Sequence, residues 1–149
     1  WSVYDGLGYS GSVLRAGTAM KRIDTTLILQ KKACAEYDFY TDSFAHDSVT
    51  FYALPTFPVN KNYGARYAFA IDDEPLQIVD IQTFGRSKEW KQDVLRNRSE
   101  RVFDLPALGK GKHILKVYAV DPDVMLDEIR IDEGYRIKAY SNIHETYIK

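Results

Sequence analysis

The sequence predicts an all-β domain, built as a β-sandwich or barrel, and three observations lead to this expectation. Short runs of alternating apolar and polar residues recur along the chain, and turn residues separate them. These runs are rich in Tyr, Phe, Val, Ile and Thr, whose side chains suit the half-buried surface of a sheet. An apolar stripe of helical spacing occurs over one short segment only.

The predicted strands follow one another along the chain. In order they are Thr25–Leu29, Ala35–Tyr40, Ser48–Leu54, Arg66–Ile71, Leu76–Thr83, Arg101–Leu105, His113–Val120, Val124–Asp132 and Tyr135–Tyr140. In His113–Val120 the side chains of Leu115, Val117 and Ala119 share one face, which is the alternation of a half-buried strand.

Turn residues explain where these strands end. Pro55 and Pro58 end the strand Ser48–Leu54, because proline cannot donate a hydrogen bond to a sheet. The other breaks are Asp72-Asp73, Gly109-Lys110-Gly111 and Asp121-Pro122-Asp123. The candidate helix is Lys88–Arg96, with Trp90, Val94 and Leu95 on one side.

Length and composition indicate one domain. The chain has 149 residues, of which 45% are hydrophobic and 28% charged, as in ordinary globular domains. Twenty basic residues against 21 acidic ones give a net charge of −1, so the basic footprint that nucleic acids require is missing. No stretch approaches the roughly 20 apolar residues of a membrane span. We therefore expect residues 1–149 to form a single domain that binds neither nucleic acid nor membrane. Because the sequence opens at Trp1 and not at Met, we expect it to be a fragment of a larger multidomain protein or a processed mature chain.

Charge is uneven along the chain. Residues 86–101 carry six basic groups against three acidic ones, and residues 121–133 carry six acidic groups against Arg130 alone. One interpretation is two solvated faces, or one pairing across the sheets. The other is a cationic patch for an acidic ligand beside an acidic strand end.

No motif for catalysis or metal binding stands in a suitable context. Residues 6–11 match G-x-G-x-x-G, but no strand of normal length precedes them and Gly17 interrupts the helix that should follow. His46, His113 and His144 are scattered, and Cys34 has no histidine near it in sequence. We expect no catalytic residue and no cofactor.

Asp127 is the one carboxylate whose predicted position is unusual. It is in register with Ile129 and Ile131, on the face that should point inward. An inward carboxylate is either satisfied by backbone N–H groups or acts as a cation ligand. A structural calcium ion is therefore the alternative to a purely structural role.

Three aromatic residues outside the apolar runs are candidates for ligand binding. Trp90 stands in a polar, basic stretch, and Tyr9 and Tyr63 each lie beside a glycine in an expected loop. Each ring either plugs the sandwich or offers a flat apolar surface for stacking on a sugar. A neighbouring cation could pair with a sugar carboxylate in the second case.

A set of motifs along nearly the whole chain carries a family resemblance. They are residues 6–13, Glu36–Phe39, Leu54–Thr56, Arg66–Ala68, Trp90 with Val94–Asn97, and Gly111–Pro122 leading into Val124–Asp132. In these motifs the sequence resembles the C-terminal domain of glycoside hydrolase family 115, the xylan α-glucuronidases. The last segment is the most specific of them.

The resemblance implies a β-sandwich of the jelly-roll or galactose-binding type, appended to a carbohydrate-active enzyme. The catalytic machinery of that family sits in a separate barrel domain, which these residues do not include. We therefore expect a non-catalytic accessory module of a polysaccharide-degrading enzyme, secreted or located in the periplasm or at the cell surface.

The expected partner is a plant-type glycan, in particular an acidic xylan-like chain. The candidate binding residues are Trp90 as a stacking platform, Arg86, Lys88 or Arg66 for a uronate carboxylate, Asn97 for hydroxyls, and Tyr63 and Tyr9. A second hypothesis is a structural domain that packs against the adjacent catalytic domain of the same chain or forms a dimer. A third is a small hydrolase using Asp121 or Asp127 as acid and base, for which the sequence offers no positive feature.

Overall fold

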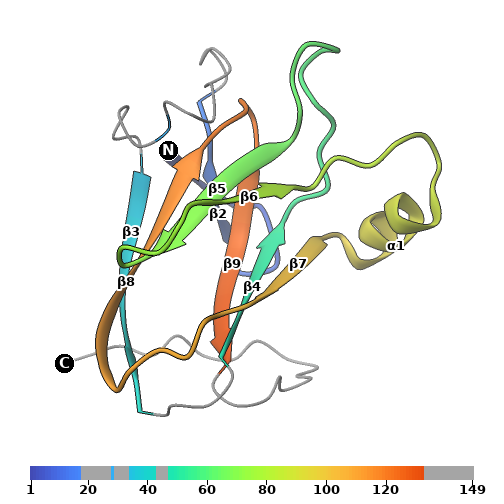
Figure 1. The fold of residues 1–149 in the computed structure, drawn as a ribbon. Coiled ribbons are helices and arrows are strands. Elements are labelled where there is room, and N and C mark those ends of the chain that lie inside the picture. The colour runs from blue at the N-terminus through green and yellow to red at the C-terminus, as the bar shows by residue number, and fades with distance from the viewer. Residues whose placement is uncertain (18–27, 29–33, 43–46, 133–149) are drawn as a thin grey trace.

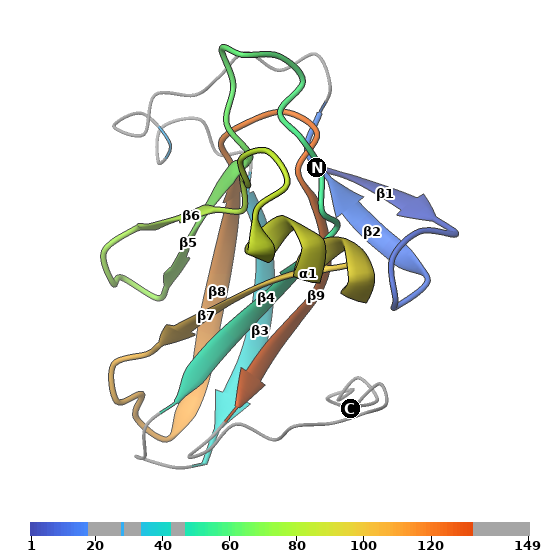
Figure 2. The same cartoon turned by 90° about the vertical axis from the view of Figure 1, so that its right-hand side faces the viewer.

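The chain folds into two packed antiparallel sheets (Figures 1 and 2). The computed structural model describes residues 1–17, 28, 34–42 and 47–132. The five-stranded sheet has the order β1-β2-β9-β4-β7 and the four-stranded sheet the order β3-β8-β5-β6. The elements are β1 Ser2–Asp5, β2 Ser12–Arg15, β3 Cys34–Thr41, β4 Ser48–Ala53, β5 Arg66–Ile71, β6 Gln77–Asp80, α1 Lys88–Arg96, β7 Ser99–Asp104, β8 Gly111–Ala119 and β9 Met125–Asp132.

The expected all-β sandwich is confirmed, and most predicted elements are present. Strands β3 to β9 fall within a few residues of the predicted segments, and α1 has the predicted bounds. Strands β1 and β2 were not predicted, because each has four residues and β1 is exposed along its whole length. Tyr135–Tyr140 lies outside the described residues, and so does Thr25–Leu29 apart from Ile28. Among the described residues, no helix is long and apolar enough to cross a membrane.

The core lies between the facing sheets and is centred on aromatic rings. Phe51 of β4 contacts Phe69 of β5, with ring centroids 4.8 Å apart, and Tyr67 at 5.4 Å. Phe103 of β7 packs edge-on against Phe69 at 5.1 Å. The alternation predicted for β8 holds, since Leu115, Val117 and Ala119 are all buried in this core. Burying each large side chain contributes about 1.5–3 kcal/mol, so the packing between the two sheets is the main source of stability.

A buried ion pair stands where the chain crosses from one sheet to the other. Asp121 follows β8, is fully buried, and accepts hydrogen bonds from Arg66 Nε (2.6 Å) and Nη2 (3.2 Å). Its carboxylate also accepts from the Arg66 N–H at 3.2 Å, and its own N–H donates to the Arg66 carbonyl at 2.9 Å. These four bonds tie the turn after β8 to the first residue of β5.

A second polar contact joins the turn before β6 to the start of β8. His113 Nδ1 lies 2.7 Å from Asp72 Oδ2, and His113 Nε2 lies 2.7 Å from the Gly109 carbonyl. Both ring nitrogens face acceptors, so these contacts favour the doubly protonated imidazole over the neutral one. Hydrogen bonds to Asp72 and then to Gly109 raise the pKa of His113. Burial alone would raise the pKa of Asp72, but its bonds to His113 and the Ile114 N–H outweigh burial and lower it.

We expect removal of one partner of the buried pair to destabilise the fold. Asp121→Asn or Arg66→Met should lower the free energy of unfolding by about 3–5 kcal/mol, because the remaining group loses its counter-charge. Urea denaturation measures this loss. Lys112→Gln is the control, since it breaks the exposed pair with Asp38 and should leave the free energy of unfolding nearly unchanged. A small effect of Asp121→Asn, comparable with that control, would contradict the assigned role.

Stability should depend on pH through His113. Its folded pKa lies above the unfolded value of about 6.5, so its contribution is complete below that pH and is lost as pH rises through the folded pKa. Asp72 acts in the opposite direction, since its contribution is lost as pH falls through its lowered pKa. The stability difference between wild type and His113→Gln should therefore be largest at about pH 5–6 and shrink towards pH 9. Urea midpoints across this range test it, and a difference that grows with pH would refute it.

Candidate functional site

Helix α1 positions the first group of candidate residues, on the side of the five-stranded sheet that faces away from the other sheet (Figures 1 and 2). Ser87 caps its N-terminus, because its hydroxyl accepts a hydrogen bond from the Trp90 N–H at 3.1 Å. Asn97 ends it in the left-handed conformation (φ 52°), with its N–H donating to the Val94 carbonyl at 3.1 Å. Arg101 ties the helix to the sheet by an ion pair with Glu89 at 2.8 Å.

Trp90 lies on the first turn of α1 and not in a loop. Its half-buried ring helps to line a shallow surface pocket. The other lining residues are Pro55, Thr56, Phe57, Ile81, Thr83 and Asp93. Phe57 is 60% exposed, so the pocket presents an accessible aromatic ring beside hydroxyl and carboxyl groups. Burial raises the pKa of Asp93, because it disfavours the charged carboxylate.

The apolar side chains expected on one side of the helix are not all packed against the sheet. Val94 is 47% exposed and Leu95 is 86% exposed, and Asp93 is the buried residue of the helix. The helix therefore packs through its polar Asp93 and its Trp90 ring, and it leaves apolar side chains in solvent.

The basic stretch 86–101 divides into paired and unpaired cations. Arg96, Arg98 and Arg101 form ion pairs with Glu100, Glu128 and Glu89, respectively. Arg86, Lys88 and Lys91 are exposed and form no ion pair with any residue in the described part of the chain. The free cations are therefore gathered at the end of α1 that also carries Trp90.

Several carboxylates of the acidic stretch 121–133 form ion pairs within the fold. Asp121 pairs with Arg66, Asp123 with Arg15, and Glu128 with Arg98. The last of these joins the acidic stretch to the basic one, so a pairing across elements accounts for much of the local charge.

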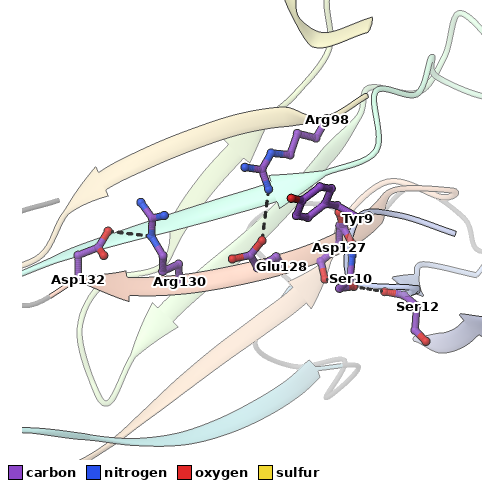
Figure 3. A network of polar contacts seen from close by, with 8 residues as sticks. All are labelled: Tyr9, Ser10, Ser12, Arg98, Asp127, Glu128, Arg130 and Asp132. Carbon is purple, nitrogen blue, oxygen red and sulfur yellow. Dashed lines mark hydrogen bonds and ion pairs between the residues drawn. The ribbon is translucent and has the colours of Figure 1, made fainter. Parts of the chain in front are cut away.

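A second group of contacts surrounds Tyr9 in the loop between β1 and β2 (Figure 3). Asp127 accepts hydrogen bonds from the Tyr9 N–H at 2.8 Å and the Ser10 N–H at 3.1 Å. The Arg98 guanidinium lies over the Tyr9 ring at 5.2 Å and over the Tyr52 ring at 4.0 Å. Glu128 Oε2 neutralises it at 3.3 Å from Nη1. Tyr9 is thus fixed through its backbone and backed by a cation, yet its side chain is 54% exposed.

Asp127 reaches this loop because it is the extra residue of a β-bulge. Tyr52 of β4 pairs with Glu128, and the next residue, Ala53, pairs with Leu126. The bulge lets Leu126 point into the core although Ile129 and Ile131 also pack there. The predicted inward register of Asp127 with Ile129 and Ile131 is therefore wrong. The interpretation that backbone N–H groups satisfy its carboxylate is the one the structure supports.

The structure groups the sequence-predicted residues unevenly. Trp90, Arg86, Lys88 and Asn97 lie on or directly beside α1, and Tyr9 meets the same region through Arg98. Arg66 opens β5 with a side chain only 16% exposed, held by Asp121. Tyr63 is half-buried in the loop between β4 and β5, where its N–H donates to the Asn60 carbonyl at 3.1 Å.

Sequence reasoning missed Phe57, Tyr52 and Arg98. Tyr52 alternates with the core residue Phe51 in β4, so its outward direction could have been found from the strand period. Phe57 lies between two prolines, which place it outside the sheet. The role of Arg98 depends on three separate elements meeting, and no local signal shows this.

The described residues bring together no group of three or more His, Cys, Asp or Glu side chains able to hold a metal ion. The only candidate named from sequence, Asp127, already accepts hydrogen bonds from the 9–10 segment. The expectation that no cofactor is required stays a prediction.

Comparison with known proteins gives a consistent family. The model of the glycosyl hydrolase family 115 C-terminal domain matches residues 1–143. Among solved structures, the chain is similar to BtGH115A, a family GH115 4-O-methyl-α-glucuronidase with specificity for decorated arabinogalactans. The two share 28% identity with a TM-score of 0.69, over 87% of this chain and 15% of that one. The chain thus spans a small part of that enzyme, and no curated protein matches it.

Gly8 offers a test of the contact that places Tyr9. Gly8 has φ +75°, and a Cβ there would lie 2.3 Å from Asp127 Oδ1 and 2.8 Å from Val13 Cγ1. Gly6 has nearly the same φ, +77°, with nothing within 4 Å of a Cβ. Gly6→Ala should cost about 1 kcal/mol of backbone strain. Gly8→Ala should cost about 1–3 kcal/mol more, because it also displaces Asp127. Urea denaturation of both variants measures the difference, and equal losses would contradict the close approach.

Proposed function

The chain belongs to the glycosyl hydrolase family 115 C-terminal domain family, and on this premise we propose that it is a non-catalytic accessory module that binds an acidic glycan beside α1. The family match supports a non-catalytic role, because the matching family model describes a C-terminal domain. The two carboxylates considered for acid–base catalysis are also engaged. Asp121 is buried against Arg66, and Asp127 is held by the loop after β1.

One observation carries the proposal: the cations of the basic stretch without an ion-pair partner among the described residues lie within four residues of Trp90, whose ring lines the aromatic pocket. An aromatic ring can stack on the apolar face of a sugar, as Trp90 and the exposed Phe57 are placed to do. Arg86 and Lys88 are free to form charge-assisted hydrogen bonds with a carboxylate. A uronate-bearing sugar offers both features at once.

The nature of the related enzyme supports this ligand class. BtGH115A is a 4-O-methyl-α-glucuronidase with specificity for decorated arabinogalactans, so its substrate carries a uronate group. We propose the same chemical class, a plant-type chain decorated with glucuronate, such as glucuronoxylan or a decorated arabinogalactan. The module then acts where such polymers occur, after secretion, in the periplasm or at the cell surface.

A second candidate function, docking to the catalytic part of the same chain or to a second copy, has its own support. Strand β1 forms an edge of the five-stranded sheet. Val3 and Tyr4 on this strand are 69% and 43% exposed, and Leu7 in the following loop is 42% exposed. Exposed apolar side chains of this kind are typical of a surface that another protein covers.

Calorimetric titration of the folded chain distinguishes the two. We expect binding to glucuronoxylan oligosaccharides that is stronger than binding to neutral xylan and that weakens with salt, because exposed charges are screened. Trp90→Ala should lower the affinity by about tenfold or more, as removal of a central aromatic contact does. Arg86→Gln with Lys88→Gln should remove the preference for the acidic glycan and leave binding to neutral xylan in place.

Arg96→Gln is the matched control, because Arg96 lies on the same helix but is already paired with Glu100. It should bind as wild type does. Thermal unfolding of each variant separates loss of binding from loss of fold. Absence of binding to every glycan by a folded wild-type chain would favour docking over the proposed function.

A further inference from the structure

Helix α1 connects two aromatic platforms rather than one. Trp90 lies on its first turn, and Arg98 follows its C-terminal cap residue, Asn97. Because the Arg98 guanidinium lies 5.2 Å from the Tyr9 ring, the loop between β1 and β2 meets the C-terminal end of this helix. Figure 2 shows the same arrangement, with α1 pointing towards the hairpin of β1 and β2. A helix of nine residues is about 13 Å long, so the two platforms stand at opposite ends of an extended surface.

We infer that the glycan site extends along α1 from Trp90 to Tyr9 and holds a chain of several sugars, with the uronate group at the Trp90 end and neutral sugars at the Tyr9 end. This inference rests on the proposed function. It adds a second binding residue, Tyr9, and a direction in which the ligand lies.

The Tyr9 ring is prepared for a ligand in a way that an ordinary surface tyrosine is not. Its backbone is fixed by Asp127 at 2.8 Å, and Ser10 donates two further hydrogen bonds to the same carboxylate from its N–H and its hydroxyl. Arg98 lies beside the Tyr9 ring (Figure 3), and its guanidinium also lies over the buried ring of Tyr52. A ring that is already held loses little conformational entropy when a ligand stacks on it.

The distribution of unpaired cations indicates which end of the site binds the uronate group. At the Trp90 end, Arg86 and Lys88 have no ion-pair partner among the described residues. At the Tyr9 end, the nearest cation is Arg98, whose charge is met by Glu128 at 3.3 Å. A carboxylate is therefore attracted to the first end and not to the second.

Asn97, the C-terminal cap of α1, lies towards the Tyr9 end and supplies polar contacts suited to sugar hydroxyls. Its backbone is fixed by the helix cap, and its side chain is exposed. A side-chain amide offers one acceptor and two donors, so it can bond adjacent hydroxyl groups.

A series of uronate-bearing xylo-oligosaccharides of increasing length tests the inference by calorimetry. For wild type, affinity should rise with length until the chain spans both platforms. Tyr9→Ala should leave the affinity for the shortest acidic oligosaccharide unchanged and remove about a tenfold gain at the longest. Tyr9→Phe should keep that gain, because the ring and not the hydroxyl makes the contact.

The matched control is Tyr40→Ala, since Tyr40 is 57% exposed against 54% for Tyr9 but lies on β3 of the other sheet. It should bind all lengths as wild type does. The inference is overturned if Tyr9→Ala binds long and short chains like wild type while Trp90→Ala weakens both, and the proposed function then survives. If wild type binds no glycan of any length, the proposed function itself fails. If Tyr9→Ala changes only association with the remainder of a family 115 enzyme, Tyr9 belongs to a protein interface, which also overturns the inference.

Discussion

The bulge at Asp127 is the constraint on which the arrangement of the candidate site depends. Without the extra residue, Leu126 and Ile129 would point to opposite faces of β9, and one of them would leave the core. With it, both stay inside and the Asp127 carboxylate is turned towards the loop between β1 and β2. Hydrogen bonds to this carboxylate hold the loop against the sheet. Gly8 leaves room for the carboxylate, and the Tyr9 ring lies next to the Arg98 guanidinium. One inserted residue thus preserves the core and also positions an exposed ring.

The fold was largely predictable from the sequence, because its strands obey local rules. β5 begins and ends at the predicted residues, and the period of β8 separates the core residue Val117 from its outward neighbours. The predictions that failed concern features that depend on pairing between distant segments. The four residues of β1 carry no apolar run, and its pairing with β2 alone makes it a strand. The register of Asp127 failed for the same reason, since a bulge is defined by the partner strand and leaves no sign in a single strand's alternation.

The candidate site shows a similar division. Trp90, Arg86, Lys88 and Asn97 were predicted together, because they are close in sequence and one helix carries them. Arg66 has the same chemistry, but the fold uses it to neutralise a fully buried carboxylate. The number of charges along a segment does not show whether a cation is available for a ligand or neutralises a buried carboxylate. The two roles can be distinguished only when the acidic partner of each cation is known, and tertiary contacts determine that partner.

Under the proposed function, each contact between the protein and a single sugar is weak, because the binding surface is shallow. The pocket at Trp90 is shallow, and a surface pocket that leaves Phe57 60% exposed cannot enclose a sugar as a deep catalytic site does. A polymer overcomes this limit, because a second contact on the same chain forms at a high effective concentration once the first has formed. Two modest platforms joined by a rigid helix therefore suit a polysaccharide better than a small free sugar. Under the proposed function, the same geometry favours reversible binding to the polymer.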